Sequence, residues 1–270
     1  MERNFFGVTR VTLSPNGDAR QIVHGRTIHG RQFLDPARAP EPLTFYHREG
    51  PLGDVFKVFA ARAGGFNPPA RSVGVIGLGA GSMAAYAKVG ERWTFYDIDP
   101  SVLRIAQDTN FFTYLARSAA AETKLVEGDA RLRLRDAADG SYDLLVLDAF
   151  SSDAIPVHLI TREALELYVR KLAPGGLLAF HISNRYLDLE PVLANLAADL
   201  RLVALGCDDM SLTDAEFATG REQSHWVVMA RGAEDLAGFQ RRARWSPPEG
   251  RAGVGVWTDD FSSPLRVWQR

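Results

Sequence analysis

The sequence is poor in cysteine, in net charge and in long apolar runs. Cys207 is the single cysteine among 270 residues, which excludes an internal disulfide framework and a cysteine-cluster zinc site. The 31 Lys and Arg residues nearly balance the 33 Asp and Glu residues, which argues against a nucleic-acid binder that relies on bulk positive charge. No uninterrupted apolar stretch approaches the roughly 18 residues of a membrane helix. We therefore expect neither a nucleic-acid nor a membrane partner.

Two further absences concern targeting and metals. The opening MERNFFGVTRV lacks the basic and apolar regions of a secretory signal, so we expect a cytoplasmic protein. None of the scattered histidines has the paired helical spacing of a zinc site, so no metal is expected. For each of them a role in the core or on the surface is the favoured interpretation.

What is present is an average globular composition, with 46% apolar and 24% charged residues. This composition and length predict a packed core in one large domain, or in one domain with a small appendage. Short β-prone runs fill residues 4–34, and Asn16-Gly17 between the first two predicts a hairpin. Residues 35–42 hold three prolines and are interpreted as an extended connection, and 46–63 as a helix. We place a small β-rich domain with a linker helix at 1–68 and a catalytic domain at 69–270.

From residue 72 onward, apolar runs alternate with helical segments. This pattern predicts a Rossmann-like, doubly wound, mostly parallel α/β sheet. Residues 201–207 and 225–230 add two more strands, and an antiparallel strand is expected at the edge of the sheet. Helices are expected over segments that include 82–89 and 100–109.

A glycine-rich turn follows the first strand of this series. Gly77, Gly79 and Gly81 stand in the sequence GLGAG, and glycines at such a turn let the backbone approach a ligand closely. The third glycine comes one position earlier than in the dinucleotide fingerprint, which disfavours NAD. A tight turn with a purely structural role is the alternative.

Acidic residues follow the next three strands. Asp97 comes roughly 20 residues after the first glycine, where a carboxylate can accept both hydroxyls of a ribose. Asp99, directly before Pro100, is better interpreted as a helix N-cap. Asp129 suits either an adenine amino group or a helix cap.

The fourth strand ends in Asp148, and Asp153 follows five residues later. The carboxyl ends of parallel strands face the ligand crevice of such a sheet. Two acids there suit a cationic substrate, although Asp153 has the alternative of a turn or cap. Asp148 directly follows an apolar run and therefore needs a partner.

Taken together, GLGAG, YDIDP, EGDAR and LDAFSSDAIP, in this order and spacing, resemble the spermidine synthase (polyamine aminopropyltransferase) family. The resemblance covers roughly residues 4–200 and includes TFYHRE near the first helix. It implies a class I S-adenosylmethionine-dependent methyltransferase-like fold. Two features depart from the family pattern: Ala149 and Phe150 lengthen the loop after Asp148, and Asp97 replaces the more common glutamate.

The resemblance also implies roles for individual residues. Gly77, Gly79 and Gly81 would line the cofactor, Asp97 would hold its ribose and Asp129 would meet its adenine. Asp148 would be the catalytic acid that deprotonates the amine. The substrate-binding residues implied by the family are Tyr46, His47, Asp153 and, on looser spacing, Gln32.

Three functional hypotheses follow. The leading one is an aminopropyltransferase that moves an aminopropyl group from decarboxylated S-adenosylmethionine to putrescine or a related amine. The second is an S-adenosylmethionine-dependent methyltransferase acting on a small substrate, and the third is a non-catalytic adenosyl- or polyamine-binding protein. The resemblance further implies a homodimer formed through the amino-terminal strands.

Overall fold

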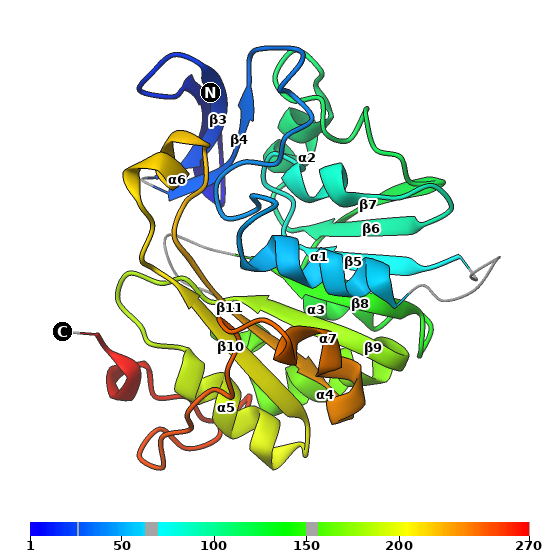
Figure 1. Ribbon diagram of the computed structural model, residues 1–270, viewed down its shortest axis with the longest axis vertical. Coiled ribbons are helices and arrows are strands. Elements are labelled where there is room, and N and C mark those ends of the chain that lie inside the picture. Colours follow the sequence, from blue (N-terminus) through cyan, green and yellow to red (C-terminus); the bar gives the residue numbers. More distant parts are fainter. Residues whose placement is uncertain (26, 63–69, 150–155, 270) are drawn as a thin grey trace.

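Seven strands form the large sheet at the centre of the computed structural model, which describes residues 1–25, 27–62, 70–149 and 156–269. The strand order is β10-β11-β9-β8-β5-β6-β7, and β11 is antiparallel to the other six strands, which all run in one direction. The strands are β5 (Ser72–Ile76), β6 (Arg92–Asp97), β7 (Glu122–Glu127), β8 (Tyr142–Leu147), β9 (Leu172–His181), β10 (Val203–Asp209) and β11 (Ser224–Ala230). The predicted fold class is confirmed, but the antiparallel strand is not at the edge as expected: it is β11, which lies between β9 and the edge strand β10 (Figure 1).

The direction of strand succession reverses between β5 and β8. From β5 the chain continues outward to β6 and β7, and it then returns to β8 and β9 on the other side. Ile76 and Leu147 are partners across this pair of strands, so Gly77 and Asp148 leave the sheet side by side. Ligands bind in open α/β sheets at such a reversal point.

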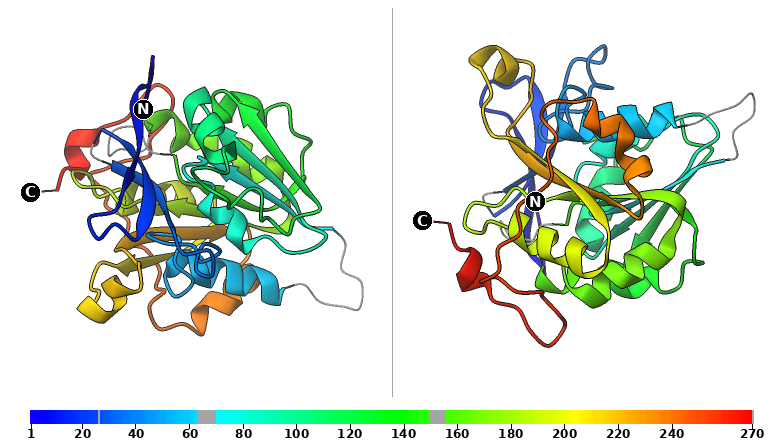
Figure 2. Two further views of the ribbon diagram at one scale, coloured as in Figure 1. Left: turned by 90° about the horizontal axis from the view of Figure 1, so that it is seen from above. Right: turned by 60° about the horizontal axis from the view of Figure 1, so that its bottom comes forward.

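Helices cover both faces of the large sheet. One face is covered by α1 (Pro51–Ala61), α2 (Pro100–Gln107) and α7 (Ala237–Gln240), and the other by α3 (Ala130–Leu134), α4 (Arg162–Lys171) and α5 (Glu190–Asp199). Figure 2 shows α4 and α5 on the side opposite α1 and α7. Short 3-10 helices occur at Ser82–Tyr86, Val157–Leu159, Ala233–Leu236 and Pro264–Val267. The two faces bury separate apolar clusters, as a buried parallel sheet requires.

A small antiparallel sheet opens the chain. It contains β1 (Glu2–Asn4), β2 (Gly7–Leu13), β3 (Ala19–His24) and β4 (Thr27–Phe33) in sequential order. The hairpin predicted at Asn16-Gly17 is confirmed, with Gly17 at a φ of +70°. The small sheet, blue in Figure 1, lies near α2 and α6 (Asp214–Ala218). The domain division at residues 68 and 69 falls outside the described residues and stays a prediction.

Three local predictions need correction. The helix expected over 46–63 begins only at Pro51, whose fixed φ suits the first helical position and holds Gly50 in an extended conformation. The helix expected over 82–89 is a short 3-10 helix that ends at Tyr86, because Ala87 is extended and leads into a turn at Gly90. The connection at 35–42 forms turns closed by backbone hydrogen bonds to Asp35, so it is not extended.

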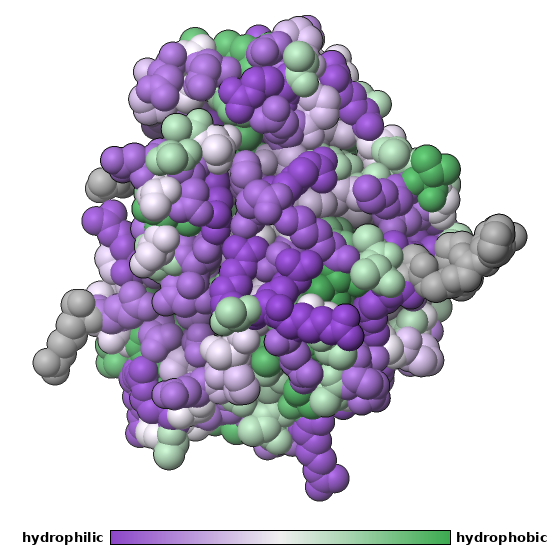
Figure 3. Space-filling model, in the orientation of Figure 1, coloured by the Kyte–Doolittle hydropathy of each residue, from purple (hydrophilic) through white to green (hydrophobic). Residues whose placement is uncertain are grey.

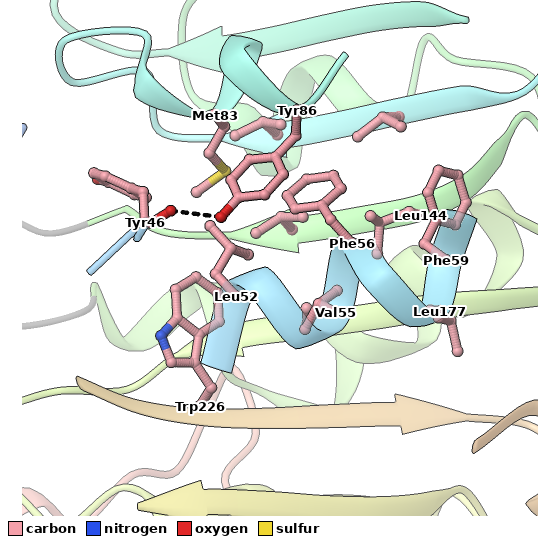
Figure 4. Packing of buried hydrophobic residues seen from close by; sticks show 14 of the residues in the cluster. Tyr46, Leu52, Val55, Phe56, Phe59, Met83, Tyr86, Leu144, Leu177 and Trp226 are labelled. Carbon is pink, nitrogen blue, oxygen red and sulfur yellow. Dashed lines mark hydrogen bonds between the residues drawn. The ribbon is translucent and has the colours of Figure 1, made fainter. Parts of the chain in front are cut away.

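The α1 helix packs on the large sheet and positions the segment before it, which contains Tyr46. Its residues Leu52, Val55 and Phe56 are buried in the same cluster as Trp226 (Figure 4). The ring of Phe56 stacks on Tyr86 with 4.2 Å between centroids. The hydroxyl of Tyr86 donates to the carbonyl oxygen of Tyr46 at 2.6 Å. This packing fixes the backbone of Tyr46 beside the sheet.

The surface and the helices give two further facts. The face seen in Figure 3 is mainly hydrophilic, and its hydrophobic side chains form small separate groups. Within the described ranges, no helix has both the length and the apolar character needed to cross a bilayer.

Candidate functional site

A cavity of about 530 Å³ opens where β5, β6 and β8 end. Its volume lies in the range of small-molecule sites, roughly 300–1,000 Å³. The large sheet contributes Gly77, Gly79, Asp97, Asp129 and Asp148 to its walls, and the small sheet contributes residues that include Ile22, His24, Thr27, Ile28 and His29. The cavity therefore lies between the two sheets, at the reversal point of the larger one.

Close backbone approaches explain two of the three glycines in the turn. A Cβ on Gly77, whose φ is +98°, would lie 2.2 Å from the carbonyl oxygen of Asp148. A Cβ on Gly79, at a φ of +54°, would lie 2.0 Å from the carbonyl oxygen of His29 in β4. Gly77 and Gly79 thus let the turn meet both the β8 loop and the small sheet. Gly81 starts the 3-10 helix next to Leu115, away from the described walls of the cavity.

Asp97 ends β6 and faces the cavity. Its Oδ2 accepts the backbone N–H of Leu78 at 2.9 Å, and its Oδ1 accepts that of Asp99 at 2.9 Å. Burial raises the pKa of Asp97 to about 6 in spite of these two donors. Each oxygen keeps a lone pair for a further donor, as two ribose hydroxyls would provide. The N-cap prediction for Asp99 is confirmed, because its Oδ1 accepts the N–H of Ser101 at the start of α2.

Asp129 lines the cavity and also caps a helix. Its Oδ1 accepts the N–H of Leu132 in the first turn of α3 at 3.0 Å. Its Oδ2 lies 3.1 Å from Nε2 of His158, which also lines the cavity. The capping alternative from the sequence is thus observed, and an adenine contact would have to coexist with it.

Asp148 lies at the centre of a buried hydrogen-bond network. The hydroxyl of Tyr46 donates to its Oδ2 at 2.7 Å, and Nδ1 of His181 lies 2.7 Å from its Oδ1. The Asp148 side chain is 6% exposed. Burial and the neighbouring Asp148 carboxylate hold the pKa of Tyr46 well above its ordinary value, so its hydroxyl remains a donor. Two residues that the sequence analysis singled out, 102 positions apart, are brought together here.

Sequence reasoning missed His181 as a site residue. It is the last residue of β9, which is the neighbour of β8 in the sheet. Its ring stacks on Trp226 with centroids 4.6 Å apart and 9° between planes. Its Nε2 lies 2.7 Å from Oγ of Ser183. The available signal was its position at the carboxyl end of a parallel strand, the same rule that identified Asp148.

The remaining predicted substrate residues are placed differently. Gln32 is buried and lies outside the described cavity walls. Its amide nitrogen donates to the carbonyl oxygen of Ala39 and to Oγ1 of Thr113, and its amide oxygen accepts the N–H of Thr113. His47 lies outside the described cavity walls, and its Nδ1 accepts the N–H of Glu49. Neither residue lines the cavity as described, and their role in substrate binding stays a prediction. Asp153 lies outside the described residues.

Among the described residues, no group of three or more His, Cys, Asp or Glu side chains is arranged to hold a metal ion. Three of the acids that line the cavity bond neighbouring side chains or backbone N–H groups instead: Asp97, Asp129 and Asp148. The arrangement can do three things chemically: approach a ligand with backbone, accept hydroxyl donors at Asp97, and accept a proton or hold a cation at Asp148.

Comparison with known sequences and structures bears on this arrangement. No family model matches the chain. A probable spermidine synthase from Corynebacterium glutamicum superposes over 94% of both chains, with a TM-score of 0.62 and 18% identity. At this identity the likeness shows the fold: a mostly parallel seven-stranded sheet with a small antiparallel sheet before it. A polyamine aminopropyltransferase from Vibrio vulnificus is 35% identical over 118 residues.

The chain resembles the spermidine synthase family. The Vibrio alignment covers 42% of this chain and 38% of that protein. A putative O-methyltransferase from Mycobacteroides abscessus is 33% identical over 134 residues, which are 48% of this chain and 55% of that protein. The alignments thus cover less than two thirds of either relative. The chain is therefore similar to proteins named for two kinds of group transfer, aminopropyl transfer and methyl transfer.

Proposed function

We propose that this protein is a transferase of the spermidine synthase type, which moves an aminopropyl group from decarboxylated S-adenosylmethionine to putrescine or a related amine. The observation that carries the proposal is the Asp148 carboxylate. It lies at the end of β8, held by Tyr46 and His181, in the same cavity as the glycine turn and Asp97. The likeness to an aminopropyltransferase and to a probable spermidine synthase supports it.

Aminopropyl transfer needs an acceptor amine in its neutral form. An alkyl ammonium with a pKa near 10.4 is neutral in about one of a few thousand molecules at pH 7. Recovering the free amine therefore costs about 4–5 kcal/mol. A carboxylate beside the amine can hold the cation in place and accept a proton as the bond forms.

The bond changes then balance without a further reactant. The amine nitrogen forms a bond to the propyl carbon next to the sulfonium, the carbon–sulfur bond breaks, and methylthioadenosine leaves. The proton that the acceptor ammonium loses before the attack goes to Asp148, directly or through water, and the product leaves as a secondary ammonium. Tyr46 keeps its own proton throughout and orients Oδ2 of Asp148.

The donor side of the cavity suits an adenosyl group. Gly77 and Gly79 would let the backbone come close to it, and Asp97 would accept the two ribose hydroxyls. Asp129 would meet the adenine amino group while it caps α3. An acid near the propyl amine would also disfavour intact S-adenosylmethionine, because its carboxylate would be repelled.

The experiment that tests the proposal compares the two forms of the donor. Calorimetry measures binding of S-adenosylmethionine and of its decarboxylated form, with methylthioadenosine as the reference, and chromatography then identifies products formed with putrescine. We expect tighter binding of the decarboxylated form and release of methylthioadenosine. Tight binding without product from any amine would contradict an enzymatic role and favour a binding protein.

Methyl transfer is the second candidate. It is favoured by the likeness to two putative O-methyltransferases, each covering about half of the chain. In that case intact S-adenosylmethionine would bind more tightly, and adenosylhomocysteine would be the product. Asp148 would then bind or deprotonate a different acceptor, and the aminopropyl proposal would be abandoned.

A further inference from the structure

The imidazole of His181 is held at both of its nitrogen atoms. Nδ1 lies 2.7 Å from Oδ1 of Asp148, and Nε2 lies 2.7 Å from Oγ of Ser183. The side chain is 2% exposed. A histidine in this position meets the candidate proton acceptor on one side and a hydroxyl on the other.

The partners of Ser183 determine which nitrogen of His181 carries hydrogen. The backbone N–H of His225 donates to Oγ of Ser183 at 2.8 Å. The hydroxyl hydrogen of Ser183 can then point to Nε2 of His181, which leaves the ring hydrogen on Nδ1, facing Asp148. This assignment, made from the hydrogen-bond partners, completes the network with a neutral imidazole and an ionised carboxylate.

Packing fixes the plane of the same ring. Trp226, the cross-strand partner of His181, stacks on it at 4.6 Å, and the ring of Phe45 lies 5.0 Å away. Trp226 is itself fully buried beneath α1. The imidazole therefore has little freedom to turn its Nδ1–H away from Asp148.

We propose that His181 is a positioning residue for Asp148. Its Nδ1–H, with the hydroxyl of Tyr46 on the other oxygen, fixes the orientation of the carboxylate and directs the remaining lone pairs toward the acceptor in the cavity. The inference rests on the proposed function for its catalytic consequence. Its structural part, the neutral Nδ1–H form, does not depend on which reaction the protein performs.

Two substitutions separate this role from packing alone. The amide nitrogen of asparagine reaches the place of an imidazole Nδ1, and that of glutamine reaches the place of Nε2. His181→Asn therefore keeps a donor for Asp148, whereas His181→Gln keeps the contact with Ser183 and removes that donor. His225→Asn is the matched control, because its side chain bonds Glu190 outside the described cavity walls.

Steady-state kinetics of methylthioadenosine release on the full chain measures the consequence. We expect His181→Gln to lower kcat by about 10- to 100-fold with a smaller change in KM, as for residues that orient a reacting group. The kcat of His181→Asn should stay within about fivefold of that of the unsubstituted protein, and the kcat of His225→Asn should equal that of the unsubstituted protein. Equal loss in both His181 variants, in parallel with a lowered Tm, would overturn the proposal in favour of a structural role.

Nitrogen NMR of the imidazoles supplies a readout besides activity. His181→Asn identifies the resonances, and the unsubstituted protein at pH 7 should show hydrogen on Nδ1 and none on Nε2. A cationic ring, or hydrogen on Nε2, would refute the positioning of Asp148. If the unsubstituted protein transfers no aminopropyl group, the proposed function fails while this measurement still decides the role of His181.

Discussion

Substitution of Asp148 by asparagine is the most informative change for the proposed chemistry. Asparagine has nearly the same shape but cannot take a proton from the attacking amine. A positioned base contributes about 10²- to 10⁴-fold to a rate, and the cation would also lose its counter-charge. We therefore expect Asp148→Asn to lower kcat by at least about 10²-fold.

The structure also predicts a cost in stability. In the unsubstituted protein both oxygens of Asp148 accept hydrogen bonds, one from Tyr46 and one from His181. Asparagine offers one acceptor and one donor, so one of these two groups would face another donor. An unsatisfied buried donor costs about 1–3 kcal/mol, and each kcal/mol corresponds to about 2–4 °C in Tm for a protein of this size.

The assay measures methylthioadenosine release by chromatography under single-turnover and steady-state conditions. Circular dichroism melts on the same preparations separate loss of fold from loss of chemistry. A variant that folds and retains kcat within tenfold of the unsubstituted protein would refute the assignment of Asp148. An unchanged calorimetric affinity for decarboxylated S-adenosylmethionine, together with lost turnover, would support the assignment of Asp148.

Four further outcomes are expected. Tyr46→Phe removes one hydrogen bond to a charged group, worth about 1.5–3 kcal/mol, and should lower kcat/KM by about 10- to 100-fold in the same release assay; an unchanged value would contradict its role. Burial raises the pKa of Asp97 to about 6, so its protonated form adds folding stability at low pH, and this stability is lost as pH rises from about 4 to 6. The affinity for methylthioadenosine should weaken as pH falls through 6, because the ionised carboxylate accepts the ribose hydroxyls. A calorimetric affinity that does not change with pH would argue against a ribose contact. Gly90→Ala, at another positive φ but with open space around it, should cost about 1–2 kcal/mol in denaturant melts, and Gly79→Ala should cost clearly more, since its Cβ would meet the β4 backbone; equal losses would contradict the close approach. We also propose that the protein is a homodimer through its small sheet, and a light-scattering mass of one chain would contradict this.

Local sequence patterns predicted much of the large sheet. Buried strands such as β5 and β8 consist mostly of apolar residues, a pattern that can be recognised whichever strands lie beside them. The rule that parallel strands end at one edge then predicted that Asp97, Asp129 and Asp148 would line one cavity. The sequence also predicted the helix cap at Asp99, because the capping hydrogen bond joins Asp99 to Ser101, only two positions away.

Helix boundaries and the hydrogen-bond partners of side chains were less predictable where residues distant in the sequence determine them. The short helix after Gly81 and the start of α1 at Pro51 were misjudged, since propensity does not show where a turn must return the chain to the sheet. Gln32 was assigned to a substrate pocket from a motif, but a local pairing with Ala39 and a distant one with Thr113 occupy its amide.

The sequence by itself determined the sheet, the order of its strands along the chain and the edge at which the acids gather, because these follow from apolar runs and short-range chemistry. Only the tertiary structure decided which side chains meet Asp148. Tyr46 arrives from the segment before α1 and His181 from the end of β9, 102 and 33 residues away. Contacts across such separations depend on how the sheets and helices pack, and no local pattern in the chain encodes them.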